Sequence, residues 1–154
     1  MFARRLAAVF PALALLLPAG AHAVVDVAPA ACPVDDVNVE VSILLSTNSL
    51  LGHDRDLCPH ASGDDEIRSA VSACGTCGFA GTAQEFKRPI AEDVAAKVKK
   101  ELKPATTAWE RYANRARILE WNEASAAVVG ESWLRAAWSV RLDERPVGPP
   151  VAGL

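Results

Sequence analysis

The sequence has no excess of basic charge and no long apolar run beyond its first residues. Among its 154 residues, 16 Lys and Arg stand against 19 Asp and Glu, a formal net charge of −3. The clustered basic surface of a nucleic-acid-binding protein is therefore missing. Without further apolar runs the chain is not a polytopic membrane protein. With 51% hydrophobic and 23% charged residues it is not a disordered tail either, so we expect a folded chain of about one domain.

The signatures of common hydrolases are also lacking. There is no G-x-S-x-G nucleophile elbow and no H-E-x-x-H helix. The acidic stretch with Asp54, Asp56, Asp64 and Asp65 has no EF-hand pattern, and we interpret it as a solvated surface. His53 lies beside these carboxylates but has no nucleophile to complete a catalytic set. The sequence therefore favours a protein that is not an enzyme.

The first residues have the three parts of a secretory signal peptide, which we place at residues 1–23. Arg4 and Arg5 supply the positive charge, and Leu6–Leu17 is uncharged and apolar. Ala21-His22-Ala23 then places small residues at the cleavage positions. As a helix the apolar stretch would cover about 18 Å, too short for the roughly 30 Å hydrocarbon core. We therefore predict cleavage after Ala23, a periplasmic or secreted location, and no integral membrane segment in the mature chain.

The mature chain divides by composition into four segments. Residues 24–31 are rich in Ala, Val and Pro and are expected to be a linker, and residues 32–81 form a head that holds all four cysteines. Residues 82–145 carry helical signals, and residues 146–154, rich in Pro and Gly, are expected to be a flexible tail. We predict an α+β fold in which a small Cys-rich, partly β head precedes about three antiparallel helices.

Local patterns place one strand in the head and three helices after it. Alternating apolar and polar residues over 39–43 predict a strand, with residues 71–73 as its partner. Capping boxes at Thr82–Glu85 and Thr107–Glu110 predict two helix starts, and a third helix is expected over about 124–142. We expect the tryptophans of this region to fill the core between the helices. They are Trp109, Trp121, Trp133 and Trp138.

Four cysteines are too few for a disulfide-dense miniprotein but enough for one metal site. Cys74-Gly75-Thr76-Cys77-Gly78 has the spacing at which two thiolates of one tight turn bind zinc, and Gly78 permits the backbone of such a knuckle. Cys32-Pro33-Val34-Asp35 has the same spacing, with a carboxylate in place of the second thiolate. The predicted zinc ligands are Cys32, Cys58, Cys74 and Cys77, for which Asp35, His53 or His60 can substitute.

Two other interpretations of the cysteines stay open at this point. In an exported chain an even number of cysteines often forms disulfides, and four cysteines allow three pairings. Alternatively, Cys74 and Cys77 are a redox-active pair, and the protein is a thiol-disulfide oxidoreductase. A redox pair of the thioredoxin kind is expected between a strand and a helix, and Gly78 is a poor helix start. The sequence thus leaves metal binding and disulfides as the leading alternatives.

The cysteine-containing motifs resemble a bacterial family, domain of unknown function 2225. That family has C-P-x-C, an acidic D-x-D-x-C-P stretch and C-x-x-C-G-[FY]-A, which Cys32–Asp35, Asp54–Pro59 and Cys74–Ala80 resemble. Trp133–Arg141 is weakly similar to the helical, TPR-like part of the family. The resemblance implies a zinc-knuckle head on a helical scaffold, with no established reaction. This chain resembles a truncated and divergent member, since an aspartate replaces the second knuckle cysteine and about three helices follow.

These patterns together predict an exported, non-enzymatic module. A metal-binding or disulfide-stapled head organises the helices, and the helical scaffold binds another protein or a second copy of the chain. Zinc is the expected cofactor. The oxidoreductase with Cys74 and Cys77 is the alternative function.

Overall fold

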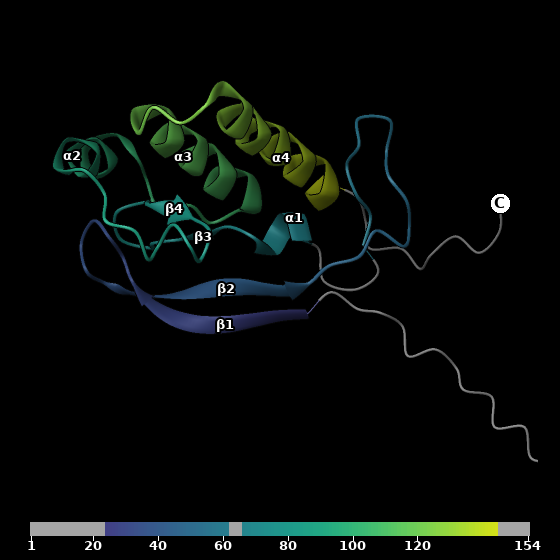
Figure 1. Ribbon diagram of the computed structural model, residues 1–154, viewed down its shortest axis with the longest axis horizontal. Helices are drawn as coiled ribbons and strands as arrows, with labels where there is room; N and C mark the ends of the chain where they lie inside the picture. The colour runs from purple at the N-terminus through teal and green to yellow at the C-terminus, as the bar shows by residue number, and fades with distance from the viewer. Residues whose placement is uncertain (1–23, 62–65, 145–154) are drawn as a thin grey trace, which may run out of the picture.

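The computed structural model describes residues 24–61 and 66–144. Within these residues it has the predicted α+β architecture, in which two small antiparallel sheets precede three long helices (Figure 1). The signal peptide expected over 1–23 and the tail expected over 146–154 lie outside the described residues. No helix in the described part of the chain has the length and apolar character needed to cross a membrane.

The first sheet is a hairpin of β1 (Val24–Ala31) and β2 (Asn38–Ser46), whose register runs from Val24↔Ser46 to Ala31↔Asn38. The strand predicted over 39–43 is the centre of β2. The linker predicted over 24–31 is wrong, because these residues form the whole of β1. Pro29 suggested irregular chain, but proline is compatible with an edge strand, and in the described structure β1 pairs with β2 alone.

The second sheet joins β3 (Ser72–Ala73) to β4 (Ala80–Gly81). Residues 71–73 were expected to pair with the strand at 39–43, but the structure pairs residues 72–73 with β4 instead. β2 still lies beside β3, because the backbone N–H of Ser42 donates to Ser72 Oγ at 2.9 Å. Figure 1 shows this small sheet between the hairpin and the helices. A short helix, α1 (Glu66–Ser69), precedes it.

Three longer helices follow: α2 (Glu92–Glu101), α3 (Ala108–Trp121) and α4 (Ala126–Glu144). The capping box predicted at Thr107 is confirmed, since Thr107 Oγ1 accepts from the Glu110 N–H and the Glu110 carboxylate accepts from the Thr107 N–H. Thr82 and Glu85 make the same reciprocal bonds at 2.8 and 3.4 Å. These two hydrogen bonds close only a turn, because Pro89 has no backbone N–H to donate and disfavours a helical conformation of the residue before it.

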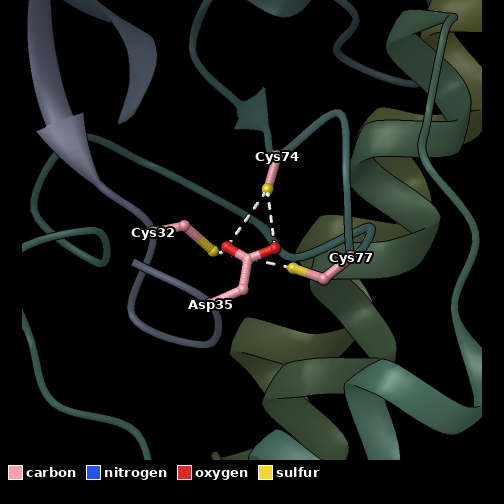
Figure 2. A group of neighbouring side chains, drawn as sticks. All are labelled: Cys32, Asp35, Cys74 and Cys77. Carbon is pink, nitrogen blue, oxygen red and sulfur yellow. Dashed lines mark hydrogen bonds between the residues drawn. The ribbon is translucent and has the colours of Figure 1, made fainter. Parts of the chain in front are cut away.

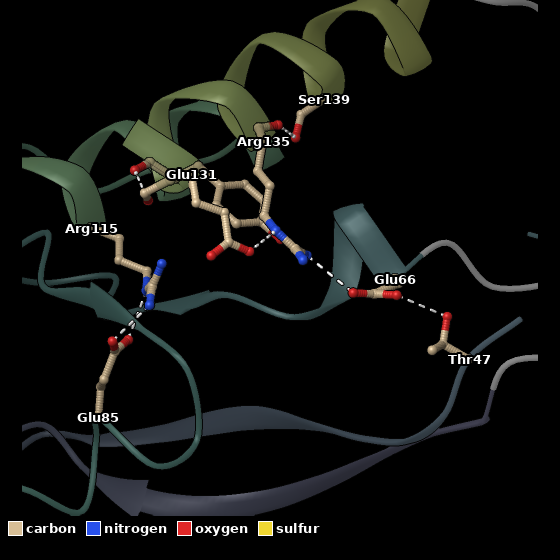
Figure 3. Close-up of polar contacts among 9 residues, drawn as sticks. Thr47, Glu66, Glu85, Arg115, Glu131, Arg135 and Ser139 are labelled. Atoms are coloured by element: carbon tan, nitrogen blue, oxygen red, sulfur yellow. Dashed lines mark hydrogen bonds and ion pairs between the residues drawn. The ribbon is translucent and has the colours of Figure 1, made fainter. Parts of the chain in front are cut away.

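The apolar side chains form two buried clusters, and both combine residues of the head with residues of the helices. Ion pairs add to this contact. Arg115 of α3 binds Glu85 at 2.8 Å, and Arg135 of α4 binds Glu66 at 3.1 Å (Figure 3). The tryptophans contribute less than expected, since Trp138 is buried but Trp109 and Trp133 are 42% and 39% exposed.

Candidate metal centre

Four side chains converge where the hairpin meets the small sheet (Figure 2). They are Cys32, Asp35, Cys74 and Cys77, and their ligand atoms all lie within 4.8 Å of one another. Cys32 directly follows β1 and Asp35 lies in the turn before β2, whereas Cys74 and Cys77 lie between β3 and β4. The site is thus made by two tight turns, each of which supplies two ligands at the same spacing.

The first turn is closed by its own backbone. The N–H of Cys32 donates to Val37 O and the N–H of Asp36 donates to Cys32 O, both at 2.9 Å. Asp36 adopts a φ of 57°, a left-handed conformation that aspartate tolerates better than most residues. This geometry turns the chain back into β2 and directs Cys32 and Asp35 toward the second turn (Figure 2).

The second turn depends on Gly78. The N–H of Cys74 donates to Phe79 O at 2.7 Å, and the N–H of Gly78 donates to Cys74 O at 3.2 Å. Gly78 has a φ of +81°, and a Cβ at this position would lie 2.5 Å from the backbone oxygen of Lys103. Asn114 of α3 donates to both Gly78 O and Lys103 O, at 3.0 and 2.9 Å. Asn114 of α3 therefore holds the turn that carries Cys74 and Cys77 in place.

The side chains contact one another directly. The thiols of Cys32 and Cys77 share a hydrogen bond with a Sγ–Sγ distance of 3.6 Å. The thiol of Cys74 lies 3.6 Å from each oxygen of the Asp35 carboxylate (Figure 2). Cys32 and Cys74 are fully buried, and Cys77 is half-buried. The backbone N–H of Phe79 also donates to Cys77 Sγ at 3.4 Å.

The protonation of these groups follows from their surroundings. Burial raises the pKa of Cys77 to about 11 and also raises the pKa of Cys32. Burial acts in the same direction on Asp35, but hydrogen bonds from the Cys32 thiol and from the Val37 N–H hold the pKa of Asp35 below its usual value. The Asp35 carboxylate is therefore an anion, whereas the thiols of Cys32 and Cys77 keep their protons when no metal is bound. A metal ion would take the place of the thiol protons.

The chemistry of the donor set narrows the choice of ion. Three thiols and one carboxylate suit a tetrahedral ion such as Zn²⁺, for which Cys and Asp are both known ligand types. Calcium and magnesium require oxygen ligands, so a site dominated by sulfur does not suit them. The described residues can therefore hold a metal ion at this place.

The structure brings together three of the four cysteines predicted as ligands, and Asp35, which was named as a substitute, completes the group. Cys58 lies elsewhere, fully buried in the cluster with Tyr112 and Trp138. His60 is also apart, since its Nε2 pairs with Asp54 Oδ1 at 2.9 Å. The signal in the sequence that distinguished Asp35 from these residues was its spacing from Cys32, which repeats that of the C-x-x-C motif.

The stretch between Asp54 and Cys58 contacts α4 instead of the metal centre. Trp138 Nε1 donates to the Asp56 carboxylate at 2.9 Å, and Arg141 pairs with the same carboxylate at 2.9 Å. His53 forms an isolated bridge with Pro59, which closes this loop on itself. These residues attach the loop to the end of the last helix.

The alternative functions of the cysteines are less well supported. All four cysteines are free thiols in this structure. Cys74 and Cys77 lie in a loop between two short strands, without the helix that lowers the pKa of a redox-active cysteine. The pKa of Cys77 is raised, which is opposite to the shift that such catalysis requires.

Comparison of the chain with protein-family models, with curated proteins and with solved structures gave no match. The resemblance to domain of unknown function 2225 therefore stays a prediction that rests on the cysteine-containing motifs. Any function assigned to the chain has to come from the geometry of the site.

Proposed function

We propose that the protein is an exported, non-enzymatic module in which a structural zinc ion fastens the hairpin to the rest of the fold. The observation that carries the proposal is the convergence of Cys32, Cys74, Cys77 and Asp35 within 4.8 Å. Two of the three thiols are fully buried, and this arrangement is typical of a closed structural site.

The position of the site supports a structural role. Its two turns belong to different sheets, and β1 and β2 form a hairpin that pairs with no other strand of the described chain. A two-stranded hairpin is marginally stable by itself. An ion bound between the turns would tie the hairpin to β3, β4 and, through Asn114, to α3.

Export is supported by the N-terminal pattern. Arg4 and Arg5, the apolar stretch Leu6–Leu17 and Ala21-His22-Ala23 follow one another in the order of a secretory signal peptide, and cleavage after Ala23 would keep all described residues of the hairpin. The module would then act in the periplasm or outside the cell, where folding is helped by a staple between distant segments.

Zinc stoichiometry tests the proposal. After refolding with zinc under reducing conditions, the native mass should exceed the chain mass by one zinc, and denaturation should release that ion and four thiols. Asp35→Asn should weaken zinc binding about 10- to 100-fold, since an amide is a poorer ligand than a carboxylate.

The neighbouring substitution Asp36→Asn is the matched control. It also removes one negative charge from the turn, but Asn accepts the φ of 57° at this position. Zinc affinity should therefore stay close to that of the unmodified chain. Absence of bound zinc, or an equal loss in both variants, would refute the proposed site.

We propose further that the helical scaffold binds a second copy of the chain through the outer face of α4. Several apolar side chains of this face are exposed to solvent. Trp133, Leu134 and Val140 are 39%, 43% and 38% exposed. The smaller exposed residues of the face are Ala126, Ala127, Gly130 and Ala137.

Two antiparallel copies of α4 related by a twofold axis at the midpoint between Trp133 and Leu134 would pack Trp133 of each copy against Leu134 of the other, with Gly130 opposite Ala137. Residues at equal distances from the midpoint are Gly130 and Ala137, Ala127 and Val140, and Ala126 and Arg141. The face is only about 22 Å long, so we expect a weak dimer that forms at high concentration.

Sedimentation over a range of concentrations tests this association. The unmodified chain should shift from monomer to dimer, and Leu134→Glu should weaken the dimer at least about tenfold by placing a charge at the centre of the contact. Leu50→Glu is the control, because Leu50 is 67% exposed and lies outside α4. A chain that stays monomeric at all concentrations, or an equal effect of both variants, would contradict this contact.

A further inference from the structure

The three cysteines of the metal centre contact different neighbours within the site. The sulfur of Cys32 is in contact with that of Cys77 at 3.6 Å, across a separation of 45 residues. The sulfur of Cys74 faces both oxygens of Asp35. Of the three cysteines, Cys32 and Cys74 are fully buried, and Cys77 alone is partly exposed.

We propose that oxidation of the metal centre links Cys32 to Cys77, and not the two cysteines of the C-x-x-C motif, and that this disulfide expels the metal ion. Cys77 is the site of oxidation and Cys32 is the resolving thiol. The release of metal rests on the proposed function, whereas the identity of the linked pair rests on the contact between the two sulfur atoms.

The geometry favours this pair. A disulfide needs a sulfur–sulfur distance of about 2.05 Å, so the sulfur atoms must approach by about 1.5 Å from their present contact. In the described structure no strand pair joins the two turns that carry them, so this approach would break no sheet hydrogen bond. Cys74 would have to leave Asp35 to react with Cys77, and its sulfur is fully buried.

The reaction balances with a peroxide as the oxidant. The Cys77 thiolate attacks one oxygen of hydrogen peroxide, the O–O bond breaks, and a sulfenic acid and hydroxide form. The Cys32 thiolate then attacks the Cys77 sulfur and expels a second hydroxide. The two sulfurs lose two electrons, the peroxide gains them, and two protons from solvent turn both hydroxides into water. Only Cys74 and Asp35 remain as ligands, too few to retain zinc.

The disulfide would keep the mechanical role of the ion. It joins the same two turns, so the hairpin stays tied to the small sheet after the metal has left. If the exported chain were oxidised, the disulfide would replace the zinc ion as the link between the two turns, and the fold would be kept. A local Cys74–Cys77 disulfide would lack this effect, because both cysteines belong to the same turn.

The test uses the unmodified chain loaded with one zinc and treated with hydrogen peroxide. We expect a mass loss of two hydrogens, release of one zinc per disulfide measured with a colorimetric chelator, and a cross-linked peptide that contains Cys32 and Cys77. Cys58 and Cys74 should remain free for alkylation. Dithiothreitol should reverse the mass change and restore zinc binding.

A parallel sample of reduced, zinc-free chain separates this inference from the proposed function. It should give the same cross-linked peptide with no zinc to release, and more slowly, because the raised pKa of Cys77 leaves less thiolate when no metal is bound. If the chain never binds zinc but forms the Cys32–Cys77 link, the zinc site fails and the assigned pair stands. If zinc binds but peptide mapping finds Cys74 joined to Cys77, or oxidation stops without a disulfide, the present inference is overturned and the zinc site stands.

Discussion

Replacing Cys74 by serine should abolish stoichiometric zinc binding and unfold the head. The substitution removes a fully buried ligand and leaves Asp35 and two thiols without the ion that would hold them together. Loss of a structural metal costs much of the folding free energy of a small site, and we expect the free energy of unfolding to fall by at least about 3 kcal/mol. Thermal unfolding in the presence and absence of zinc measures the effect.

Cys58→Ser is the matched control, because Cys58 is equally buried but lies outside the metal centre. It places a hydroxyl in an apolar cluster and should cost about 1–3 kcal/mol. This variant should still bind one zinc and should still be stabilised by it, whereas Cys74→Ser should not respond to zinc. An unchanged melting temperature in Cys74→Ser would contradict the structural role of the site.

Gly78→Ala should have the second largest effect. An alanine at a φ of +81° is strained, and its Cβ would lie 2.5 Å from Lys103 O, which is backbone and cannot rotate away. The strain costs about 1–2 kcal/mol, and with the clash we expect a total loss of about 3 kcal/mol or more. Zinc affinity should fall as well, since the turn also carries Cys77. Chemical denaturation with and without zinc measures both quantities.

Gly75→Ala provides the comparison within the same turn. A Cβ at Gly75 meets no atom within 4 Å, so this substitution should change the free energy of unfolding by less than about 0.5 kcal/mol. Equal effects of the two alanine substitutions would show that the close approach of Lys103 does not matter for stability.

Short-range signals in the sequence predicted the parts of the fold that local interactions decide. The capping box at Thr107 and the alternation over 39–43 were both found in the structure, as α3 and β2. The wrong predictions concern which segments pair with each other as strands. Whether residues 24–31 form a strand depends on β2, and whether residues 71–73 pair with β2 or β4 depends on how the small sheet is placed. The local sequence pattern determines neither of these strand pairings.

In the candidate metal centre, too, local spacing could be interpreted from the sequence, whereas long-range contacts could not. The C-x-x-C-like spacing, which both turns share, is visible in the sequence and pointed to Cys32, Cys74 and Cys77, with Asp35 named only as a substitute ligand. The exclusion of Cys58 does not follow from spacing, because it depends on long-range contacts. Asp56, two residues before Cys58, binds Trp138 and Arg141 of α4. These contacts hold the loop against α4, so Cys58 is buried beside Tyr112 and Trp138 instead of joining the other three cysteines.

The hydrogen bonds from Asn114 to Gly78 O and Lys103 O have a consequence for moving the Cys74–Phe79 turn into other proteins. Part of the shape of this turn depends on a helical residue 36 positions further along the chain. A grafted Cys74–Phe79 segment would lack the amide that holds its carbonyl, and it would need a substitute for α3 in its new host. The turn and α3 would therefore have to be transferred together.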